Sequence, residues 1–372
     1  MFHVSRNEAK TGTTVIELLN GFEHALRTAL PGNWGVELAR QASAGVAGYL
    51  PDAIYRLKAP GGELATIVAD VKYNVIPRDL TAVTSQLWHV SELIGADTTV
   101  LISPFVSPLA REKLAEAGVG WFDATGNLQV RMDQPAVFLS SIGASRNPFV
   151  DPADHRLKSL RGPASARVVR ALCELPLPLG VRMFGQEANV GGGSSSRVLE
   201  LLSREGLITR EDSGRVVAVR KRALIQRWTD DYGLVSSNHV TGMLDPRGID
   251  HALTALRSAA DGHVVTGSVA ARAYLPTGMV PVTPLTTLVV HTDRPVDLIR
   301  DTGLRQVERG ANVLVVKPFD EVLLDRAREI DGIRCAAPAQ VVADLLTGPG
   351  RSSEEAEQLI KVLATEDQGW MT

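Results

Sequence analysis

Residues 194–219 have the sequence SSSRVLELLSREGLITREDSGRVVAV. The first half predicts a helix, because its apolar residues between 198 and 202 recur at helical spacing and serine is favourable at a helix start. Gly206 suits the left-handed conformation that ends many helices. The second half predicts a β-hairpin, in which two apolar runs flank a turn at residues 212–214.

Two further helices are predicted upstream, over residues 164–175 and 182–189. The order of three helices followed by a hairpin resembles a winged helix-turn-helix, in which the third helix enters the DNA major groove and the hairpin touches the backbone or minor groove. A winged helix that contacts proteins instead is the alternative. The resemblance implies DNA contacts from Ser194, Ser195, Ser196 and Arg197 on the third helix and from Arg210, Arg215 and Arg220 on the hairpin.

Charge is distributed unevenly along the chain. Residues 156–227 contain 14 Lys and Arg residues against six Asp and Glu residues, an excess of eight positive charges. The whole chain has a net charge of −3, so the remaining residues carry −11. A basic segment between acidic flanks is typical of a nucleic-acid-binding module, although a solvated basic face would have the same composition.

Composition excludes several classes of protein. A length of 372 residues predicts two or three domains, and 44% hydrophobic with 22% charged residues excludes a disordered or collagen-like chain. Only two cysteines, Cys173 and Cys335, exclude a disulfide framework and a cysteine-rich zinc site. No apolar run reaches 18 residues and the N-terminus lacks a signal-peptide pattern, so we expect a cytoplasmic protein that does not enter a membrane.

The N-terminal 145 residues predict an α/β domain, in which strands at 53–57 and 64–71 carry ionisable side chains. Asp70 and Lys72 are two residues apart on one strand and share a face, and Asp52 directly precedes the neighbouring strand. Two carboxylates and an ammonium group suit Mg²⁺-assisted phosphodiester cleavage. The alternative is a surface ion pair between Asp70 and Lys72 without a catalytic role.

The pattern Pro51-Asp52 followed by Asp70-Val71-Lys72 resembles the PD-(D/E)xK restriction-endonuclease-like superfamily. The predicted order of helix, three strands, helix and strand agrees with that resemblance, as does Gln86 on the following helix. It implies catalytic roles for Asp52, Asp70, Lys72 and Gln86, with Mg²⁺ bound by Asp52 and Asp70. Many members of this superfamily only bind DNA. Two functions therefore stay open: a Mg²⁺-dependent DNA endonuclease targeted by the winged helix, or a non-catalytic transcriptional regulator or antitoxin-like DNA binder.

The C-terminal region contains HVVTGSVAARAYLP at 263–276 and TLVVHTD at 287–293. This pattern resembles the nucleotidyltransferase fold, in which a Gly-Ser pair, here Gly267-Ser268, begins a helix. The next strand lacks the acidic pair that would hold Mg²⁺, so we expect no transferase activity. The segment GANVLVVKPFDEVLLD at 310–325 resembles the C-terminal domain of AbiEi-type antitoxins, which implies regulation or partner binding; a structural or dimerisation domain is the alternative.

The sequence therefore predicts an α/β multidomain protein. We expect a restriction-endonuclease-like domain at 1–145, a linker near 146–161, a winged helix-turn-helix at 160–232 and a nucleotidyltransferase-like domain at 238–372. The expected partner is double-stranded DNA, with a second copy of the chain or a regulatory protein as further candidates.

Overall fold

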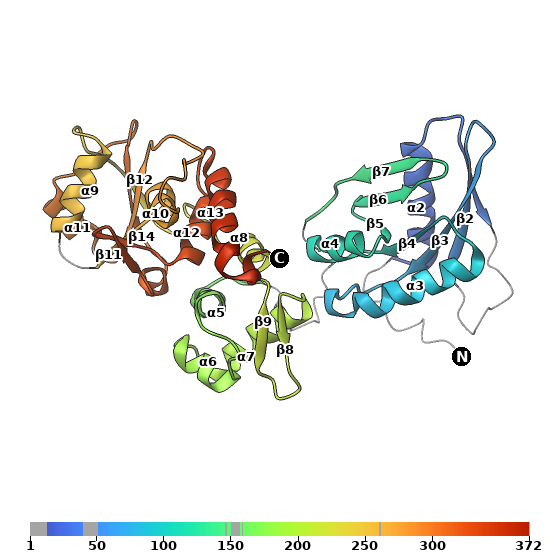
Figure 1. Cartoon of the computed structure of the whole chain (residues 1–372), viewed down its shortest axis with the longest axis horizontal. Coiled ribbons are helices and arrows are strands. Elements are labelled where there is room, and N and C mark those ends of the chain that lie inside the picture. Colours follow the sequence, from blue (N-terminus) through green and yellow to red (C-terminus); the bar gives the residue numbers. More distant parts are fainter. Residues whose placement is uncertain are drawn as a thin grey trace. The chain divides into compact units, whose positions relative to one another are not determined.

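The computed structural model describes residues 13–39, 51–145, 147–149, 157, 159–259 and 262–371 (Figure 1). The chain divides into two compact units, of which the first comprises Met1–His155 with Arg204–Gly206 and the second comprises Arg156–Ser203 and Leu207–Thr372. Both units combine helices with sheets, so the predicted α/β multidomain organisation is confirmed. The linker predicted near 146–161 lies largely outside the described residues.

The first unit is built on a sheet whose described strands follow one another in chain order. The central strands β3, β4 and β5 are parallel, and the strands on either side are antiparallel. The order α2-β1-β2-β3-α3-β4 is the one expected from the sequence. The strands are β1 (Gly35–Ala39), β2 (Ala53–Lys58), β3 (Leu64–Val71), β4 (Thr98–Ser103), β5 (Gly120–Asp123), β6 (Leu128–Met132) and β7 (Val137–Ser141).

Helices cover both faces of this sheet. Helix α2 (Val15–Ala29) begins at a capping box between Thr14 and Glu17 and buries its apolar stripe against one face. Two helices contribute to the core on the other face: α3 (Leu80–Ile94) and α4 (Pro108–Glu116). The short 3-10 helix η1 (Pro77–Asp79) directly precedes α3. Asp70 pairs in register with Leu101, a member of that second core, so Asp70 lies on the face covered by α3 and α4.

The second unit begins with three helices and a hairpin, in the order expected from the sequence. Helices α5 (Pro163–Glu174), α6 (Val181–Glu187) and α7 (Gly192–Arg204) precede strands β8 (Ile208–Arg210) and β9 (Val216–Val219). A bridge between Leu179 and Val216 adds a third, minimal strand to the hairpin. Helix α8 (Lys221–Thr229) follows at once and buries Leu224, Ile225 and Trp228.

A second mixed sheet forms the rest of this unit, with described strands in the order β13-β10-β14-β12-β11-β16-β15. The strands are β10 (His239–Leu244), β11 (His263–Thr266), β12 (Leu288–Thr292), β13 (Arg305–Gln306), β14 (Val313–Lys317), β15 (Arg328–Ile330) and β16 (Ile333–Cys335). The helices are α9 (Ile249–Ser258), α10 (Gly267–Tyr274), α11 (Pro295–Thr302), α12 (Pro338–Leu346) and α13 (Ser352–Glu366), with 3-10 helices η2 (Glu321–Leu324) and η3 (Gln368–Trp370).

Buried polar contacts join the helical part of this unit to the second sheet. Arg170 on α5 is 1% exposed, and its guanidinium donates to the Gln340 side chain of α12 and to the carbonyls of Val322 and Asp325. A buried, partnerless guanidinium would be very unfavourable, so these contacts hold α5 against α12. Residues 160–232, apart from Arg204–Gly206, and residues 238–372 lie in one compact unit. No helix in the described ranges is both long and apolar enough to cross a bilayer.

Candidate functional site

Helices α6 and α7 meet closely because small side chains lie where they approach. A Cβ built on Gly185 would lie 3.4 Å from Ser195 Oγ and 3.1 Å from the carbonyl oxygen of Val190. Ser195 is fully buried, and its hydroxyl donates to that same carbonyl at 3.4 Å. Ser195 is therefore a packing residue of the helix pair, and the expectation that it faces DNA does not fit its position.

The other predicted residues of α7 lie toward solvent. Ser196 and Arg197 are exposed, and Ser194 is half-buried. The Arg197 guanidinium donates to the Gly193 carbonyl at 3.2 Å, which places it over the first turn of the helix. The space around residues 191–193 is open, since a Cβ built on each of these glycines meets no atom within 4 Å. The start of α7 can therefore be approached closely by a ligand.

The hairpin turn is held by its own backbone and by one arginine. Gly214 adopts a φ of +84°, which glycine tolerates best, and Arg210 Nε donates to the Gly214 carbonyl at 3.0 Å. Arg215 is exposed beside it. Arg220 lies at the opposite end of β9, where its backbone N–H donates to Leu207, so it belongs to the root of the hairpin. The seven predicted contact residues therefore divide between the α7 start, the turn, the root and the interior.

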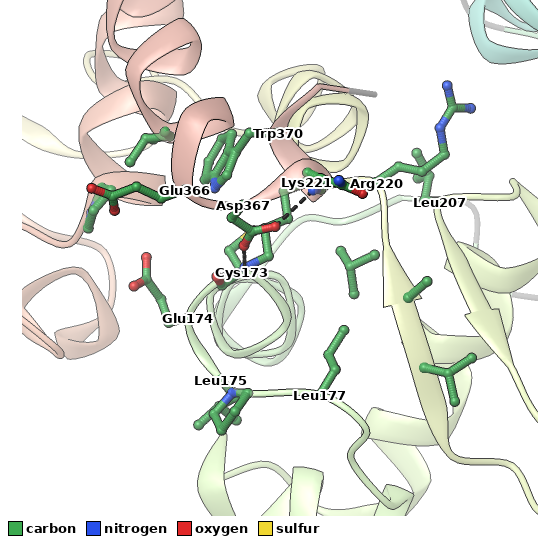
Figure 2. Close-up of a pocket in the computed structure, with 18 of the residues that line it drawn as sticks. Cys173, Glu174, Leu175, Leu177, Leu207, Arg220, Lys221, Glu366, Asp367 and Trp370 are labelled. Atoms are coloured by element: carbon green, nitrogen blue, oxygen red, sulfur yellow. Dashed lines mark hydrogen bonds and ion pairs between the residues drawn. The ribbon is translucent and has the colours of Figure 1, made fainter.

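Much of the basic excess of residues 156–227 is neutralised within the second unit. Acidic side chains outside that segment pair with five of its cations, and Arg170 is buried. The charge excess of the segment is therefore not a measure of its free positive surface. The pairs are Arg161–Asp231 at 3.7 Å, Arg167–Asp320 at 3.0 Å, Lys221–Asp367 at 2.7 Å, Arg222–Glu357 at 2.9 Å and Arg227–Asp231 at 3.0 Å. Figure 2 shows the Lys221–Asp367 pair in the pocket at the root of the hairpin.

Within residues 156–227, three exposed arginines have no ion pair with any residue that the structure describes: Arg182, Arg197 and Arg215. They lie on α6, on α7 and beside the hairpin turn. These elements are neighbours, because a Cβ on Gly214 would lie 3.8 Å from Val181, the residue before Arg182. We name Arg182, Arg197 and Arg215 the arginine face. Sequence reasoning missed Arg182, although its position in the first turn of the second helix could have identified it.

The structure brings Asp52, Asp70 and Lys72 together in the first unit. Ala53 pairs with Ala69, so Asp52 and Asp70 follow as the next residues on adjacent antiparallel strands. Asp52 Oδ2 accepts the backbone N–H of Val71 at 2.7 Å, and Lys72 Nζ forms an ion pair with Asp70 Oδ2. Asp70 is 2% exposed, whereas Asp52 and Lys72 are half-buried. We name these three side chains the Asp-Asp-Lys cluster.

The two carboxylates are close enough to affect each other. Burial raises the pKa of Asp52 to about 6; the N–H of Val71 opposes this change, and the charge of Asp70 adds to it. One cation, Lys72, faces two carboxylates, so a further positive charge would be favourable here. Asp52 and Asp70 are the residues that would hold Mg²⁺, because this ion commonly takes one or two protein carboxylates and keeps several waters. No group of three or more His, Cys, Asp or Glu side chains suited to a metal occurs among the described residues.

Gln86 does not join this cluster through any described hydrogen bond. It lies on α3 with its side chain exposed, while Thr84 and Leu87 on the same helix are buried. The structure therefore gives no contact that supports a catalytic role for Gln86.

Asp123 is a buried carboxylate that serves the fold. Its two oxygens accept hydrogen bonds from the backbone of Val106, from Thr125 and from Asn127, at 2.6–3.2 Å. The side chain is 0% exposed and its hydrogen-bonding capacity is used by the turn after β5. Asp123 therefore organises that turn and is not available to a substrate.

The Gly267-Ser268 pair does begin a helix, α10, but its hydroxyl is used internally. Ser268 Oγ donates to Glu355 at 2.6 Å, and Glu355 is 4% exposed. The next strand, β12, carries His291 within its LVVHT sequence, and His291 Nε2 lies 2.9 Å from Asp344 in a completely buried pair. The polar groups in this region satisfy one another inside the unit.

Comparison of the chain with protein-family models, curated proteins and solved structures finds no match. The arginine face and the Asp-Asp-Lys cluster are therefore the two candidate functional features of the described residues.

Proposed function

We propose that the second unit binds duplex DNA as a winged helix, with α7 entering the major groove and the hairpin turn lying along the backbone. The observation that carries this proposal is the arginine face, where three exposed guanidinium groups without ion pairs extend from α6, α7 and the turn. Arginine is well suited to phosphate and to guanine edges because its planar group donates two parallel hydrogen bonds. The open glycine-rich start of α7 allows a phosphate to approach backbone N–H groups.

Acidic residues on the same elements limit the affinity that we expect. Glu200, Glu211 and Asp212 are exposed on α7 and in the hairpin turn. These charges oppose non-specific association with phosphate, so binding to random DNA should lie near the weak end of the usual range, at a Kd of roughly 10⁻⁴ to 10⁻⁵ M at physiological salt. Tight binding would then require a preferred sequence.

Fluorescence anisotropy with a labelled duplex at 50–200 mM KCl tests the proposal. Each phosphate contact contributes about −0.9 to the slope of log K against log salt, so Arg197→Ala and Arg215→Ala should each flatten the slope by about that amount. Arg305→Ala is the matched control, because Arg305 is exposed on β13 in the second sheet. Binding that is independent of salt, or equal losses for Arg197→Ala and Arg305→Ala, would refute it.

We infer a second candidate function, Mg²⁺-dependent cleavage of DNA at the Asp-Asp-Lys cluster. It is favoured by the juxtaposition of Asp52, Asp70 and Lys72 on adjacent strands. Bound Mg²⁺ supplies positive charge and an acidified water in sites of this kind. Asp52 must be deprotonated to contribute its full charge, and Lys72 can donate a hydrogen bond to an attacking water or to a phosphate oxygen.

A plasmid-nicking assay with Mg²⁺, Mn²⁺ or EDTA tests this second function. We expect wild-type protein to nick supercoiled DNA only with metal, and Asp70→Asn and Lys72→Ala to lose the activity. Lys58→Ala is the matched control, since Lys58 is an exposed lysine at the other end of β2. If wild type and Lys72→Ala both give background cleavage, the cleavage function is refuted and a non-catalytic DNA-binding regulator remains the candidate.

A further inference from the structure

The edges of the two large sheets differ in how they are protected. A sheet edge presents unpaired backbone N–H and C=O groups, and proteins commonly place charged side chains there to prevent pairing with another chain. Strand β1 carries the exposed Glu37, and the second sheet ends in β13 with the exposed Arg305 and in β15 with the exposed Glu329. Strand β7, the other edge of the first sheet (Figure 1), has the uncharged sequence VFLSS and pairs with β6 without a bulge. Among the four edges that these described strands form, β7 alone lacks a charge.

The neutral stretch extends beyond β7 and exposes two large apolar side chains. Residues 134–145 contain no Asp, Glu, Lys or Arg. Phe138 is 67% exposed, and Ile142, the residue after the strand, is 89% exposed. Val137 and Leu139 point the other way and pack in the core that α2 covers. Because side chains alternate along a strand, Phe138 lies on the opposite face, where the edge of the sheet is open to solvent.

Hydrogen bonds from one side hold the chain in place after β7 ends. The N–H of Gly143 donates to the Asn127 side chain at 2.8 Å, and the N–H of Ala144 donates to Thr125 Oγ1 at 3.1 Å. The amide of Asn127, a fully buried residue, donates back to the carbonyl of Ala144 at 2.9 Å. All three bonds come from the turn that leads into β6, so they fix the inner side of this edge. A fixed edge loses little conformational entropy when a strand pairs with its outer side.

We propose that β7 is a self-association edge, at which two copies of the chain pair antiparallel about a two-fold axis at Ser140. In a contact of this symmetry, each residue faces its counterpart across the axis. With Ser140 opposite Ser140, Phe138 of each copy lies opposite Ile142 of the other copy. Opposed Cβ atoms of antiparallel strands lie about 4.5–5.5 Å apart, so these side chains are in contact. The two exposed apolar side chains therefore cover each other twice, and the two first sheets become one continuous sheet.

Other registers cover this edge less well. An axis at Leu139 places Phe138 against Ser140 and Ile142 against Ala136, so each large apolar side chain meets a smaller one. A second copy is favoured over a different protein, because the edge is complementary to itself and carries no charge that would select an oppositely charged surface. The contact involves the first unit and does not depend on the proposed DNA-binding function.

Sedimentation velocity of the full chain across about 1–200 µM tests the association, because short edge contacts give weak dimers. The mass should rise from 39.9 kDa toward twice that value. Phe138→Lys should raise the dimer Kd at least tenfold. Leu38→Lys is the matched control, since Leu38 is an exposed leucine on β1, and it should leave the Kd unchanged. A chain that stays at 39.9 kDa throughout, or equal losses for the two lysine variants, would overturn the proposal.

Charge pairing tests the register. Adding Ile142→Glu to Phe138→Lys should lower the dimer Kd at least fivefold again, because each lysine then faces a glutamate of the other copy. Adding Ile142→Lys instead should give no recovery. Both positions are exposed, so the fold of the unit should be kept. Equal Kd values for the two double variants would refute the Phe138–Ile142 register.

A disulfide tests the position of the axis. In the proposed dimer the Cα atoms of the two Ser140 residues lie about 4.5–5.5 Å apart, a separation that a disulfide can span. Ser140→Cys should therefore give a covalent dimer when it is oxidised with diamide, whereas Glu37→Cys on the β1 edge should stay monomeric on a denaturing gel. The native Cys173 and Cys335 are buried and should not react. Equal crosslinking of the two cysteine variants would refute an axis at Ser140.

Discussion

Asp344 on α12 is the most connected buried carboxylate in the second unit, and its removal should nearly unfold that unit. Oδ2 accepts from Thr266 Oγ1 at 2.6 Å and lies 2.9 Å from His291 Nε2. Oδ1 accepts from Tyr232 at 2.6 Å and from Gln340 at 2.7 Å. Asp344 is 1% exposed, so bulk water does not reach the carboxylate in the folded unit.

The cost of Asp344→Ala follows from this geometry. Four hydrogen bonds to a charged group, each with a net value of about 1.5–3 kcal/mol, set an upper bound of roughly 6–12 kcal/mol. The carboxylate itself loses several kcal/mol on burial, which offsets a large part of that sum. Breaking a buried pair by removing one partner costs about 3–5 kcal/mol, and we expect about 4 kcal/mol for Asp344→Ala. That value is a large fraction of the usual stability of a domain.

Urea denaturation followed by circular dichroism measures the loss, with Glu308→Ala as the exposed control that should change stability by less than about 0.5 kcal/mol. The loss should also depend on pH. Although burial favours the neutral acid, His291, Thr266 and Tyr232 together hold the pKa of Asp344 below its usual value. The contribution of Asp344 is therefore present above about pH 4 and disappears as the pH falls through the folded pKa. A loss below 1 kcal/mol at pH 7 would refute the argument that this carboxylate holds the unit together.

Three further predictions concern single residues. The pKa of Asp52 is raised to about 6, so the folded state binds more protons than the unfolded state between about pH 4 and 6. The free energy of unfolding should therefore fall as the pH rises through this window. Urea denaturation at several pH values should show that Asp52→Asn abolishes this dependence. Asp123→Ala removes five hydrogen bonds from a buried turn and should destabilise the first unit by about 3 kcal/mol. Hydrogen exchange of the β5 amides measures this loss, and an unchanged exchange rate would contradict the structural role of Asp123. Gly185→Val should separate α6 from α7, because even a Cβ at this position would lie 3.1 Å from the carbonyl oxygen of Val190. The variant should therefore reduce DNA affinity at least tenfold in the anisotropy assay. Retained affinity would show that the α6–α7 pair does not contact the DNA.

The sequence predicted the elements whose signals are local. Helix α3 occupies residues 80–94, the stretch that the sequence pattern predicts as a helix, and β3 matches its predicted range of 64–71. The clustering of Asp52, Asp70 and Lys72 was also predictable, because two of them share a strand face and the third precedes an adjacent antiparallel strand. Strand β7 was not predicted; it lies at the sheet edge with Phe138 67% exposed, so burial imposes little alternation on its sequence.

Which charged side chains are buried or ion-paired could not be predicted from the sequence. The count of 14 basic residues in 156–227 is correct, but Arg170 is buried and other cations pair with acids that are more than 100 residues away, such as Asp320 and Glu357. In the sequence, Ser195 looked equivalent to Ser194 and Ser196. In the structure, Ser195 lies on the side of α7 that packs against α6 and is buried, whereas Ser194 is half-buried and Ser196 is exposed. Local spacing determines helices, strands and shared faces because these depend on near neighbours along the chain. Burial and ion pairing depend on which distant segments pack together, and only the tertiary structure decided those.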